Sequence, residues 1–412
     1  MPLIVPFKGL RPAEGRANEV VAPPYDVMNT AEAREMAQGR PWSFLHISRP
    51  EIDLPDGTDP YAPEVYAKAR ENLDRMIADG VLVRDGKPCY YAYRLTMGEH
   101  VQTGLVAAAS VAAYDADRIK KHEFTRPVKE DDRVRQIEAL NAQTGPVFLV
   151  YRANADVDNL LAEVSEQTPD IDVTALDAVR HQVWIIDDDS RIDLLTSCFN
   201  AMDALYVADG HHRSASGARV AHARRGPGQN DSGDPSWNYF LSVIFPDNQM
   251  QILDYNRVIR DLNGMTPQAF LDRVAGTFHV ESSDRPVKPA SPGEFGMYLE
   301  GRWYRLTLPS DRIPDDPVAS LDVSLLADNL IAPLLGIIDQ RTDDRIDFVG
   351  GIRGLEGLMK RVDSGEMAVA FSLPPTSMEA LMAVADAGEV MPPKSTWFEP
   401  KLADGLVSHV LD

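Results

Sequence analysis

The sequence has few cysteines, fewer basic than acidic residues, and no long apolar run. Its two cysteines, Cys89 and Cys198, stand far apart in apolar stretches, which argues against a disulfide framework and predicts buried, reduced thiols. No segment approaches the roughly 18 consecutive apolar residues that a membrane-spanning helix requires. The opening MPLIVPFKGLRP lacks the apolar core and cleavage site of a signal peptide. We therefore expect a cytoplasmic protein without a membrane partner.

Basic residues are outnumbered by acidic ones, 41 to 63, which gives a formal net charge of -22. Such a surface repels phosphate backbones, so we expect no nucleic-acid partner, although a local basic pocket for a small anion is compatible with it. The apolar fraction of 44% is that of an ordinary globular protein, and the length of 412 residues predicts two or three domains. The oligomeric state is not encoded in any recognisable pattern, and a homodimer is left open.

Alternating helical and strand-like patterns predict an α/β fold of the α+β type, with a mixed sheet flanked by helices. Helices are predicted from residue 31, with Thr30 as N-cap, and at 63–79, 131–142, 157–164, 191–202, 211–224, 320–335 and 377–387. Strands are predicted at 44–48, 90–95, 101–114, 147–151, 183–186, 205–208, 239–245, 251–259, 345–349 and 367–373, with a hairpin at 293–308.

Two segments rich in proline, glycine or polar residues divide these patterns. Residues 225–236 are interpreted as a loop or a lid, and the proline-rich residues 285–292 as a domain boundary. The predicted domains are an N-terminal α/β lobe at 1–98, a phosphate-binding core at 99–284 and a C-terminal α/β domain at 285–412.

The sharpest motif is Asp209-Gly210-His211-His212-Arg213, which we call the cradle. It follows the apolar strand 205–208 and opens a small-residue helix. A helix N-terminus carries unpaired N–H groups and the positive end of the helix dipole, and Gly210 allows a ligand to approach the backbone. The histidines add donors, and Arg213 can hold two phosphate oxygens at once. The cradle therefore predicts an anion site, most simply for phosphate.

Two other interpretations of the cradle compete with this one. Asp209 is also a good helix cap, which would leave two surface histidines with no function. A metal site made of His211 and His212 is disfavoured, because adjacent histidines on a helix point to different sides.

A second polar segment is Ile119–Arg126, which contains His122, Glu123 and Thr125 and precedes Arg133. It directly follows an apolar strand. Glu123 is a candidate general base toward a hydroxyl, or a carboxylate that faces magnesium. A solvated loop is the alternative.

Three further segments contain candidate binding residues. In Met391–Lys401, prolines stiffen the backbone around Lys394, Ser395 and Thr396, a set that suits a phosphate pocket or a plain surface turn. Earlier in the chain, Tyr25 and Asp26 follow two prolines, and His46 and Arg49 end an apolar run. These four, with Thr125, are candidate substrate-binding residues, and structural roles are the alternative.

The motifs together resemble the domain of unknown function 1015 family over essentially the whole chain. The segments that carry the resemblance are APPYDV at 22–27, FLHISRP at 44–50, IKKHEFT at 119–125, ADGHHR at 208–213 and MPPKSTWFEPK at 391–401.

A more distant resemblance concerns the chemistry. Free L-serine kinases of the ParB/sulfiredoxin-like superfamily carry His-Glu, Asp-Gly-His-His-Arg and Pro-Lys-Thr-Thr-like segments in the same order as this chain. The resemblance implies a ParB/sulfiredoxin-like mixed-sheet core. It also implies that Glu123, with His122 beside it, activates a serine hydroxyl and that the cradle binds donor phosphates. The longer spacing between Glu123 and Asp209 here implies an insertion.

These motifs lead to one principal hypothesis and two rivals. The principal hypothesis is a kinase that transfers a phosphoryl group from ATP, ADP or pyrophosphate to free L-serine or a similar hydroxy compound, giving O-phosphoserine, with Mg²⁺ neutralising the donor. His211, His212, Arg213 and Lys394 would stabilise the transferred group, and Asp209 would hold the metal or share the role of base. No Walker-type motif is present, which excludes a standard P-loop. The first rival is a ParB-like nucleotide-binding regulatory protein. A hydrolase is disfavoured, because there is no nucleophile motif.

Overall fold

The computed structural model describes residues 2–225 and 234–412, and its chain divides into two compact units. The first unit contains the residues up to Met250 together with Pro400–Asp412, and the second contains Gln251–Glu399. The C-terminal thirteen residues therefore return to the first unit after the chain has formed the second.

The first unit is organised around a mixed sheet of nine described strands, in which β6-β11-β8-β12-β5-β4-β10-β9 are neighbours in that order and β1 pairs with β5. The β11–β6 and β12–β8 pairs are parallel and the other pairs are antiparallel. The strands are β1 (Ile4–Val5), β4 (Tyr90–Met97), β5 (His100–Ser110), β6 (Ile119–Lys120), β8 (Val147–Tyr151), β9 (Ile171–Thr174), β10 (Arg180–Ile186), β11 (Leu205–Asp209) and β12 (Tyr239–Pro246).

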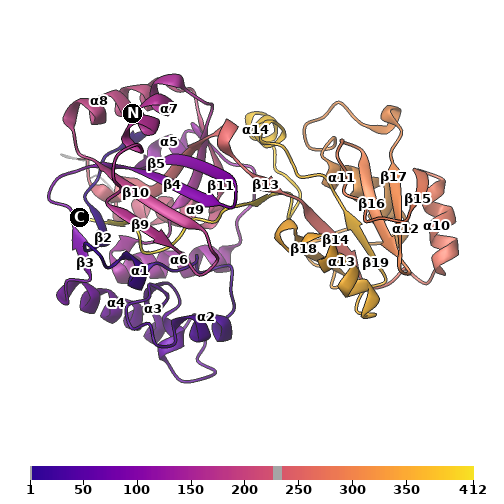
Figure 1. The fold of residues 1–412 in the computed structure, drawn as a ribbon, viewed down its shortest axis with the longest axis horizontal. Helices are drawn as coiled ribbons and strands as arrows, with labels where there is room; N and C mark the ends of the chain where they lie inside the picture. Colours follow the sequence, from indigo (N-terminus) through magenta and orange to yellow (C-terminus); the bar gives the residue numbers. More distant parts are fainter. Residues whose placement is uncertain (1, 226–233) are drawn as a thin grey trace. The chain divides into compact units, whose positions relative to one another are not determined.

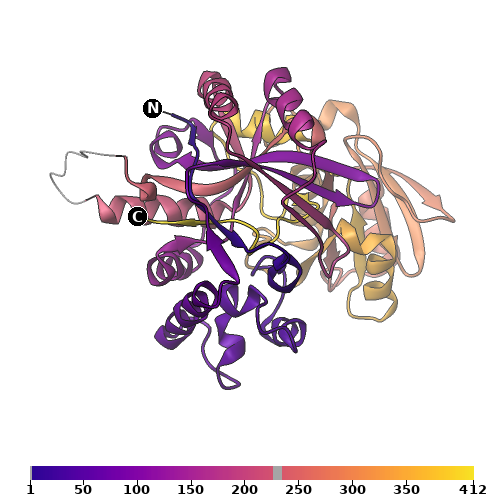
Figure 2. The same cartoon turned by 60° about the vertical axis from the view of Figure 1, so that its left-hand side comes forward.

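Four helices accompany this sheet: α5 (Val111–Asp115), α7 (Ala155–Val164), α8 (Asp189–Ala201) and α9 (His211–Arg224). Leu161, Leu195 and Phe199 from α7 and α8 are buried with the apolar side chains of the central strands in one core cluster. Figures 1 and 2 show α7 and α8 on one side of the first unit's sheet and the early helices on the other. The apolar periodicity of these segments explains the burial.

A second layer of the first unit contains the four-stranded sheet β3-β2-β21-β7, which joins the two ends of the chain. Its elements are β2 (Gly9–Pro12), β3 (Leu82–Arg84), β7 (Ala142–Gln143) and β21 (Ser408–Val410), with helices α1 (Ala17–Val20), α2 (Thr30–Ala37), α3 (Leu45–Ser48), α4 (Pro63–Ala78) and α6 (Pro127–Leu140). Helices α2, α3 and α4 share one core cluster with Leu10 of β2. Short 3-10 turns lie at Pro50–Asp53, Ser236–Asn238 and Asp247–Gln249.

The second unit has an antiparallel six-stranded sheet of order β15-β17-β16-β19-β14-β18 and a two-stranded pair, β13-β20. The strands are β13 (Ile252–Leu253), β14 (Tyr255–Ile259), β15 (His279–Ser283), β16 (Glu294–Leu299), β17 (Arg302–Thr307), β18 (Ile346–Gly350), β19 (Val369–Ser372) and β20 (Trp397–Phe398). The helices are α10 (Pro267–Ala275), α11 (Asp322–Leu326), α12 (Ala332–Leu335), α13 (Gly354–Asp363) and α14 (Met378–Asp386), with a π-helical segment at Ala327–Ile331 and 3-10 turns at Ser310–Arg312 and Gly351–Arg353.

The predicted mixed α/β class is confirmed, and most predicted elements occur, but three were misread. Residues 44–48 form helix α3 instead of a strand, because a short buried apolar run has no period that separates the two. The strand predicted at 101–114 ends at Ser110, whose hydroxyl accepts a hydrogen bond from the Ala113 N–H and caps α5. The N-cap of α2 is Asn29, not Thr30, because Asn29 and Glu32 form a capping box.

The units divide at positions other than the predicted 98 and 284. Position 98 is the turn of the hairpin formed by β4 and β5, and residues 285–292 connect β15 to β16, which both pair with β17. Proline-rich composition therefore marks a connection inside one sheet. Most of the predicted loop at 225–236 lies outside the described residues.

Two predictions from composition concern cysteines and membranes. Cys89 and Cys198 are both free, as expected, but only Cys89 is buried, whereas Cys198 is partly exposed. Within the described residues, no helix has the length and apolarity that crossing a bilayer demands.

Candidate functional site

The cradle lies where strand β11 turns into helix α9. Gly210 occupies the N-cap position with φ of +92°, a left-handed conformation that favours glycine. No side chain caps the helix, and the Asp209 carboxylate instead accepts a hydrogen bond of 2.7 Å from the Gly210 N–H. The interpretation of Asp209 as a plain helix cap is therefore wrong. The first-turn N–H groups of a fourteen-residue helix lack a side-chain acceptor, which is the arrangement that binds anions.

Asp209 forms an ion pair with Lys401 from the C-terminal segment of the first unit. Lys401 Nζ lies 2.9 Å from Asp209 Oδ2. Burial alone would raise the pKa of Asp209, but the charges of Lys401 and Arg213 hold that pKa well below its usual range. Asp209 therefore stays ionised. Its pairing with Lys401, the last residue of the segment MPPKSTWFEPK, was not predicted from the sequence.

The predicted role of Asp209 as a magnesium ligand does not fit its surroundings. Magnesium takes six oxygen ligands in a near-octahedral arrangement. One carboxylate oxygen of Asp209 faces Lys401 and the other accepts from Gly210. The groups that act on Asp209 electrostatically include Lys401, Arg213 and His211, which offer nitrogen donors. The described residues around Asp209 thus form no oxygen-lined magnesium site.

His122 and Glu123, which follow β6, meet His211 at the start of α9. The rings of His122 and His211 pack edge to face with centroids 4.5 Å apart. Glu123 Oε2 lies 3.8 Å from His211 Nδ1, and one ligand atom from each of the three residues lies within 4.8 Å of the others. Two imidazoles and a carboxylate suit a transition metal better than magnesium. The structure therefore brings the predicted catalytic residues Glu123 and His122 to the cradle.

Both buried histidines of this cluster are neutral at pH 7. Burial lowers the pKa of His122 to about 4, although the charge of Asp209 acts in the opposite direction. Burial and the neighbouring His122 also lower the pKa of His211. An anion at the start of α9 would therefore meet backbone N–H groups and the helix dipole rather than imidazolium charge.

His212 and Thr125 order the chain between the cluster and α6. His212 Nε2 accepts a hydrogen bond of 3.0 Å from the Arg126 N–H. The Thr125 hydroxyl donates to the Glu130 carboxylate. Among the described residues, the cluster of possible metal ligands contains His211 but not His212. The predicted binding roles of His212 and Thr125 remain predictions.

Arg213 directs its guanidinium toward the N-terminal loop of the first unit. Its Nη2 lies 3.4 Å from Asp26 Oδ2, and its Nη1 donates to the Pro146 carbonyl. Burial would lower the pKa of Arg213, but Asp26 and Asp209 raise it above its usual value. Asp26 and Arg213, which the sequence separates widely, therefore form part of one site.

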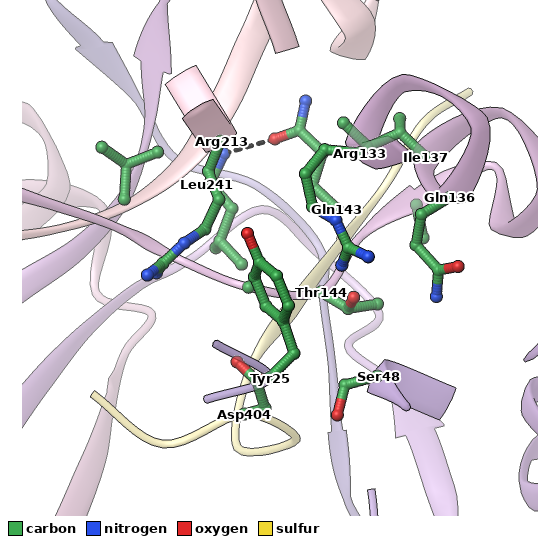
Figure 3. Close-up of a pocket in the computed structure, with 13 residues that line it drawn as sticks. Tyr25, Ser48, Arg133, Gln136, Ile137, Gln143, Thr144, Arg213, Leu241 and Asp404 are labelled. Atoms are coloured by element: carbon green, nitrogen blue, oxygen red, sulfur yellow. Dashed lines mark hydrogen bonds between the residues drawn. The ribbon is translucent and has the colours of Figure 1, made fainter. Parts of the chain in front are cut away.

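A cavity opens beside Arg213, entirely within the first unit, with about 470 Å³ of space when its open mouth is included. Tyr25, Ser48, Arg133, Arg213 and Asp404 contribute polar groups to its wall. In Figure 3 the Tyr25 ring stands between the side chains of Arg213 and Arg133, with Asp404 beneath it. Tyr25 is one of the predicted substrate-binding residues, whereas no role was predicted for Ser48, Arg133 or Asp404.

Burial and neighbouring charges shift the pKa values of the groups that line the cavity. The Arg133 guanidinium lies 3.9 Å from the centre of the Tyr25 ring, and it donates to Asp132 Oδ2 at 2.7 and 2.9 Å. Burial raises the pKa of Tyr25 to about 12, so its hydroxyl keeps its proton. Burial also raises the pKa of Asp404 to about 7, although Arg213 and Arg133 act to lower it.

His46 and Arg49, two predicted substrate-binding residues, are engaged in holding the N-terminal loops. Arg49 donates to the carbonyls of Tyr25 and Met28, at 2.8 and 2.7 Å, and to Glu51 at 2.7 Å. His46 Nδ1 lies 2.8 Å from Asp53 Oδ1, and its Nε2 lies 3.1 Å from the Arg40 carbonyl. Arg49 therefore positions the loop that carries Tyr25.

Lys394, Ser395 and Thr396 belong to the second unit. The Lys394 carbonyl accepts a hydrogen bond of 3.0 Å from Arg257, and the Ser395 hydroxyl donates to the Pro392 carbonyl at 2.7 Å. Lys394 has a φ of +58°, which marks a tight turn. Their assignment to the donor site stays a prediction.

Comparison with family models decides the family. Residues 4–324 match the model described as Protein of unknown function (DUF1015). The chain belongs to this family. Since the match covers most of the first unit, the cradle and most of the cavity wall lie inside the DUF1015 region.

Comparison with solved structures gives similarities of low identity. A conserved hypothetical protein from Pyrococcus furiosus is 14% identical, with a TM-score of 0.34 and coverage of 74% of this chain and 96% of that one. A free serine kinase in complex with AMP is 14% identical, with a TM-score of 0.35 and coverage of 74% and 92%. SbnI with a C-terminal truncation, from Staphylococcus aureus, is 11% identical, with a TM-score of 0.38 and coverage of 72% and 84%.

No curated protein matches the chain. The structural similarities are too low to establish an activity for this member of the DUF1015 family.

Proposed function

We propose that the protein transfers a phosphoryl group from ATP, ADP or pyrophosphate to the hydroxyl of a small molecule, with free L-serine as the leading acceptor and O-phosphoserine as the product. The observation that carries the proposal is the position of the Glu123 carboxylate, 3.8 Å from His211 at the uncapped N-terminus of α9. A base and an anion site thus lie side by side.

The roles of the residues follow from this geometry. The N–H groups of the first turn of α9 hold the oxygens of the donor phosphates, as helix N-termini do. Glu123 accepts the proton of the acceptor hydroxyl while that oxygen attacks the terminal phosphorus and the bridging P–O bond breaks. The electron pair of that bond leaves with the donor product. The pKa of His122 and that of His211 are both lowered by burial, so neither imidazole beside Glu123 carries a charge at pH 7.

The order of the motifs supports the same reaction. His122-Glu123 precedes Asp209–Arg213, and the segment with Lys394 comes last, as in the free L-serine kinases that the chain resembles. No step is assigned to a protein-bound magnesium ion, because Asp209 is engaged with Lys401 and Gly210.

The test is a search for product with each donor. The purified protein is incubated with L-serine and ATP, ADP or pyrophosphate in magnesium-containing buffer, and O-phosphoserine is measured by ³¹P NMR. At least one donor is expected to give product, and Glu123→Gln is expected to abolish it while nucleotide binding is retained. If no donor gives product, and Glu123→Gln binds nucleotide and keeps its cellular function, the proposal fails in favour of a nucleotide-binding regulatory protein.

A further inference from the structure

Three residues that line the cavity beside Arg213 each have a buried polar atom that lacks a hydrogen-bond partner in the described structure: Ser48 Oγ, Arg213 Nε and Asp404 Oδ1. Ser48 and Asp404 are only 4% and 2% exposed. Buried polar groups nearly always have a partner, and each one without a partner needs a cause. Three such atoms on the wall of one cavity indicate that a polar ligand completes their hydrogen bonds.

The three atoms require different kinds of partner. Arg213 Nε–H must donate, and Asp404 Oδ1, when ionised, must accept. The Ser48 hydroxyl can do either. A ligand that satisfies all three therefore carries both acceptor and donor groups.

The charges around the cavity require the same combination. Arg213 and Arg133 supply positive charge, and Asp404 supplies a negative charge when it is ionised. A simple anion would suit the arginines and would be repelled by Asp404. A simple cation would suit Asp404 and would be repelled by the arginines. A small molecule with a carboxylate and an ammonium group satisfies both ends.

We infer that this cavity binds a small zwitterion of the α-amino acid class, whose carboxylate faces Arg213 and Arg133 and whose ammonium group faces Asp404. The identification of this zwitterion as the phosphoryl acceptor, L-serine in particular, rests on the proposed function. The cavity and the cradle share Arg213, and a side chain at Gly210 would contact Val147 of the cavity wall at 3.4 Å. The two sites are therefore neighbours in the first unit.

The experiment is a calorimetric titration of the full-length protein without any donor. The ligands are L-serine, glycerate, which replaces the amine by a hydroxyl, and ethanolamine, which lacks the carboxylate. L-Serine is expected to bind at least about tenfold more tightly than either analogue, because each analogue lacks one of the two charged groups that the cavity attracts. The remaining common amino acids are titrated in the same way to define the side chain that the cavity accepts.

Two variants and one control locate the binding. Asp404→Asn is expected to weaken the binding of L-serine at least about tenfold and to change the affinity for glycerate little, because only the partner of the ammonium group is lost. Ser48→Ala is expected to weaken the binding of L-serine by a smaller factor. It replaces Asp404→Asn in the test if that variant does not fold. The control is Asp322→Asn, a partly buried aspartate of the second unit that accepts from the Gly293 N–H at 2.6 Å, and it should bind L-serine as the unmodified protein does.

The inference is overturned if no amino acid binds at concentrations up to about 10 mM. It is also overturned if both Asp404→Asn and Ser48→Ala bind like the unmodified protein. L-Serine that binds without forming product with any donor would contradict the proposed function and support the inference. Product formed only from hydroxy compounds without an amine would support phosphoryl transfer and contradict the inference.

Discussion

The cradle and the cavity meet at Arg213, yet they are built from different kinds of group. The cradle offers backbone N–H groups and the neutral imidazole of His211, with the neutral imidazole of His122 beside it. Its one carboxylate, Asp209, is paired with Lys401. The cavity offers formal charges, and three of its polar atoms lack partners. A site made of backbone N–H groups accepts any anion of suitable size. A site made of charged side chains selects a ligand whose charges match their positions. This difference is why we propose that the cradle binds the donor phosphates and that the cavity selects the acceptor.

The largest expected effect comes from Arg213→Lys, which changes both sites at once. Lysine keeps the charge, but it lacks the planar fork that contacts Asp26 and Pro146. We expect kcat/KM for L-serine phosphorylation to fall by about 100- to 1000-fold, with weaker binding of both nucleotide and L-serine in calorimetry. Arg219→Lys, on the same helix and paired with Glu130 and Asp131 at the surface, is the matched control. An effect on one ligand alone would separate the two sites.

Asp404→Asn tests the charge of the cavity through the pH dependence of folding stability. The pKa of Asp404 is raised to about 7 in the folded protein from 3.8, so the unmodified protein loses stability as the pH rises between these values. The Asp404→Asn variant does not lose this stability, because asparagine has no proton to release. Its stability relative to the unmodified protein should therefore increase from pH 4 to pH 8, by up to about 4 kcal/mol. Urea unfolding at several pH values measures the difference, and a pH-independent difference would contradict the account.

The affinity for L-serine should depend on pH for the same reason. Burial and the charge of Asp26 raise the pKa of Asp404 to about 7, although Arg213, Arg133 and the backbone of Tyr25 act to lower it. The ligand's ammonium group needs the ionised carboxylate. From pH 6 to pH 8 the ionised fraction rises about tenfold, so the association constant should rise by about the same factor. Titrations at these two pH values measure it. A flat profile in the unmodified protein, or the same slope in Asp404→Asn, would break the proposed link.

The smallest expected effect is that of Ser48→Ala on stability without ligand. Because Ser48 Oγ has no partner among residues 2–225 and 234–412, its removal should change the free energy of unfolding by less than about 0.5 kcal/mol. Ser43 is the matched control, since its hydroxyl accepts from the Leu45 N–H at 3.4 Å, and Ser43→Ala should destabilise by about 1 kcal/mol. Thermal unfolding compares the two, and equal losses would mean that Ser48 has an undetected partner.

Elements whose apolar residues repeat with a clear period were predicted well from the sequence. Helix α4 carries Val65, Ala69, Leu73 and Met76 on its buried face, and its predicted and observed ends nearly coincide. Helix α3 was misread, because four residues are too few to display a period. The order of strands in the large sheet could not be predicted, since it depends on pairing between distant segments.

The cradle was predicted because all its residues are consecutive and local geometry explains its chemistry. The cavity was only partly predicted. Tyr25 and Asp26 were noticed for their proline-rich setting, but Arg133 lies within α6 and Asp404 near the end of the chain, and neither stands in a motif of its own. Long-range folding alone brings them together, and a partner such as Lys401 for Asp209 is equally invisible in sequence.

The most direct test of the central claim, that cradle and cavity are two subsites of one phosphotransferase site, is a crystal structure with L-serine and a nonhydrolysable ATP or pyrophosphate analogue. The account predicts that the terminal phosphate of the analogue lies at the N-terminus of α9. It also predicts that the serine amine contacts Asp404 and that the serine hydroxyl points toward Glu123. Phosphate and serine bound on separate surfaces, or serine absent from the cavity, would contradict it.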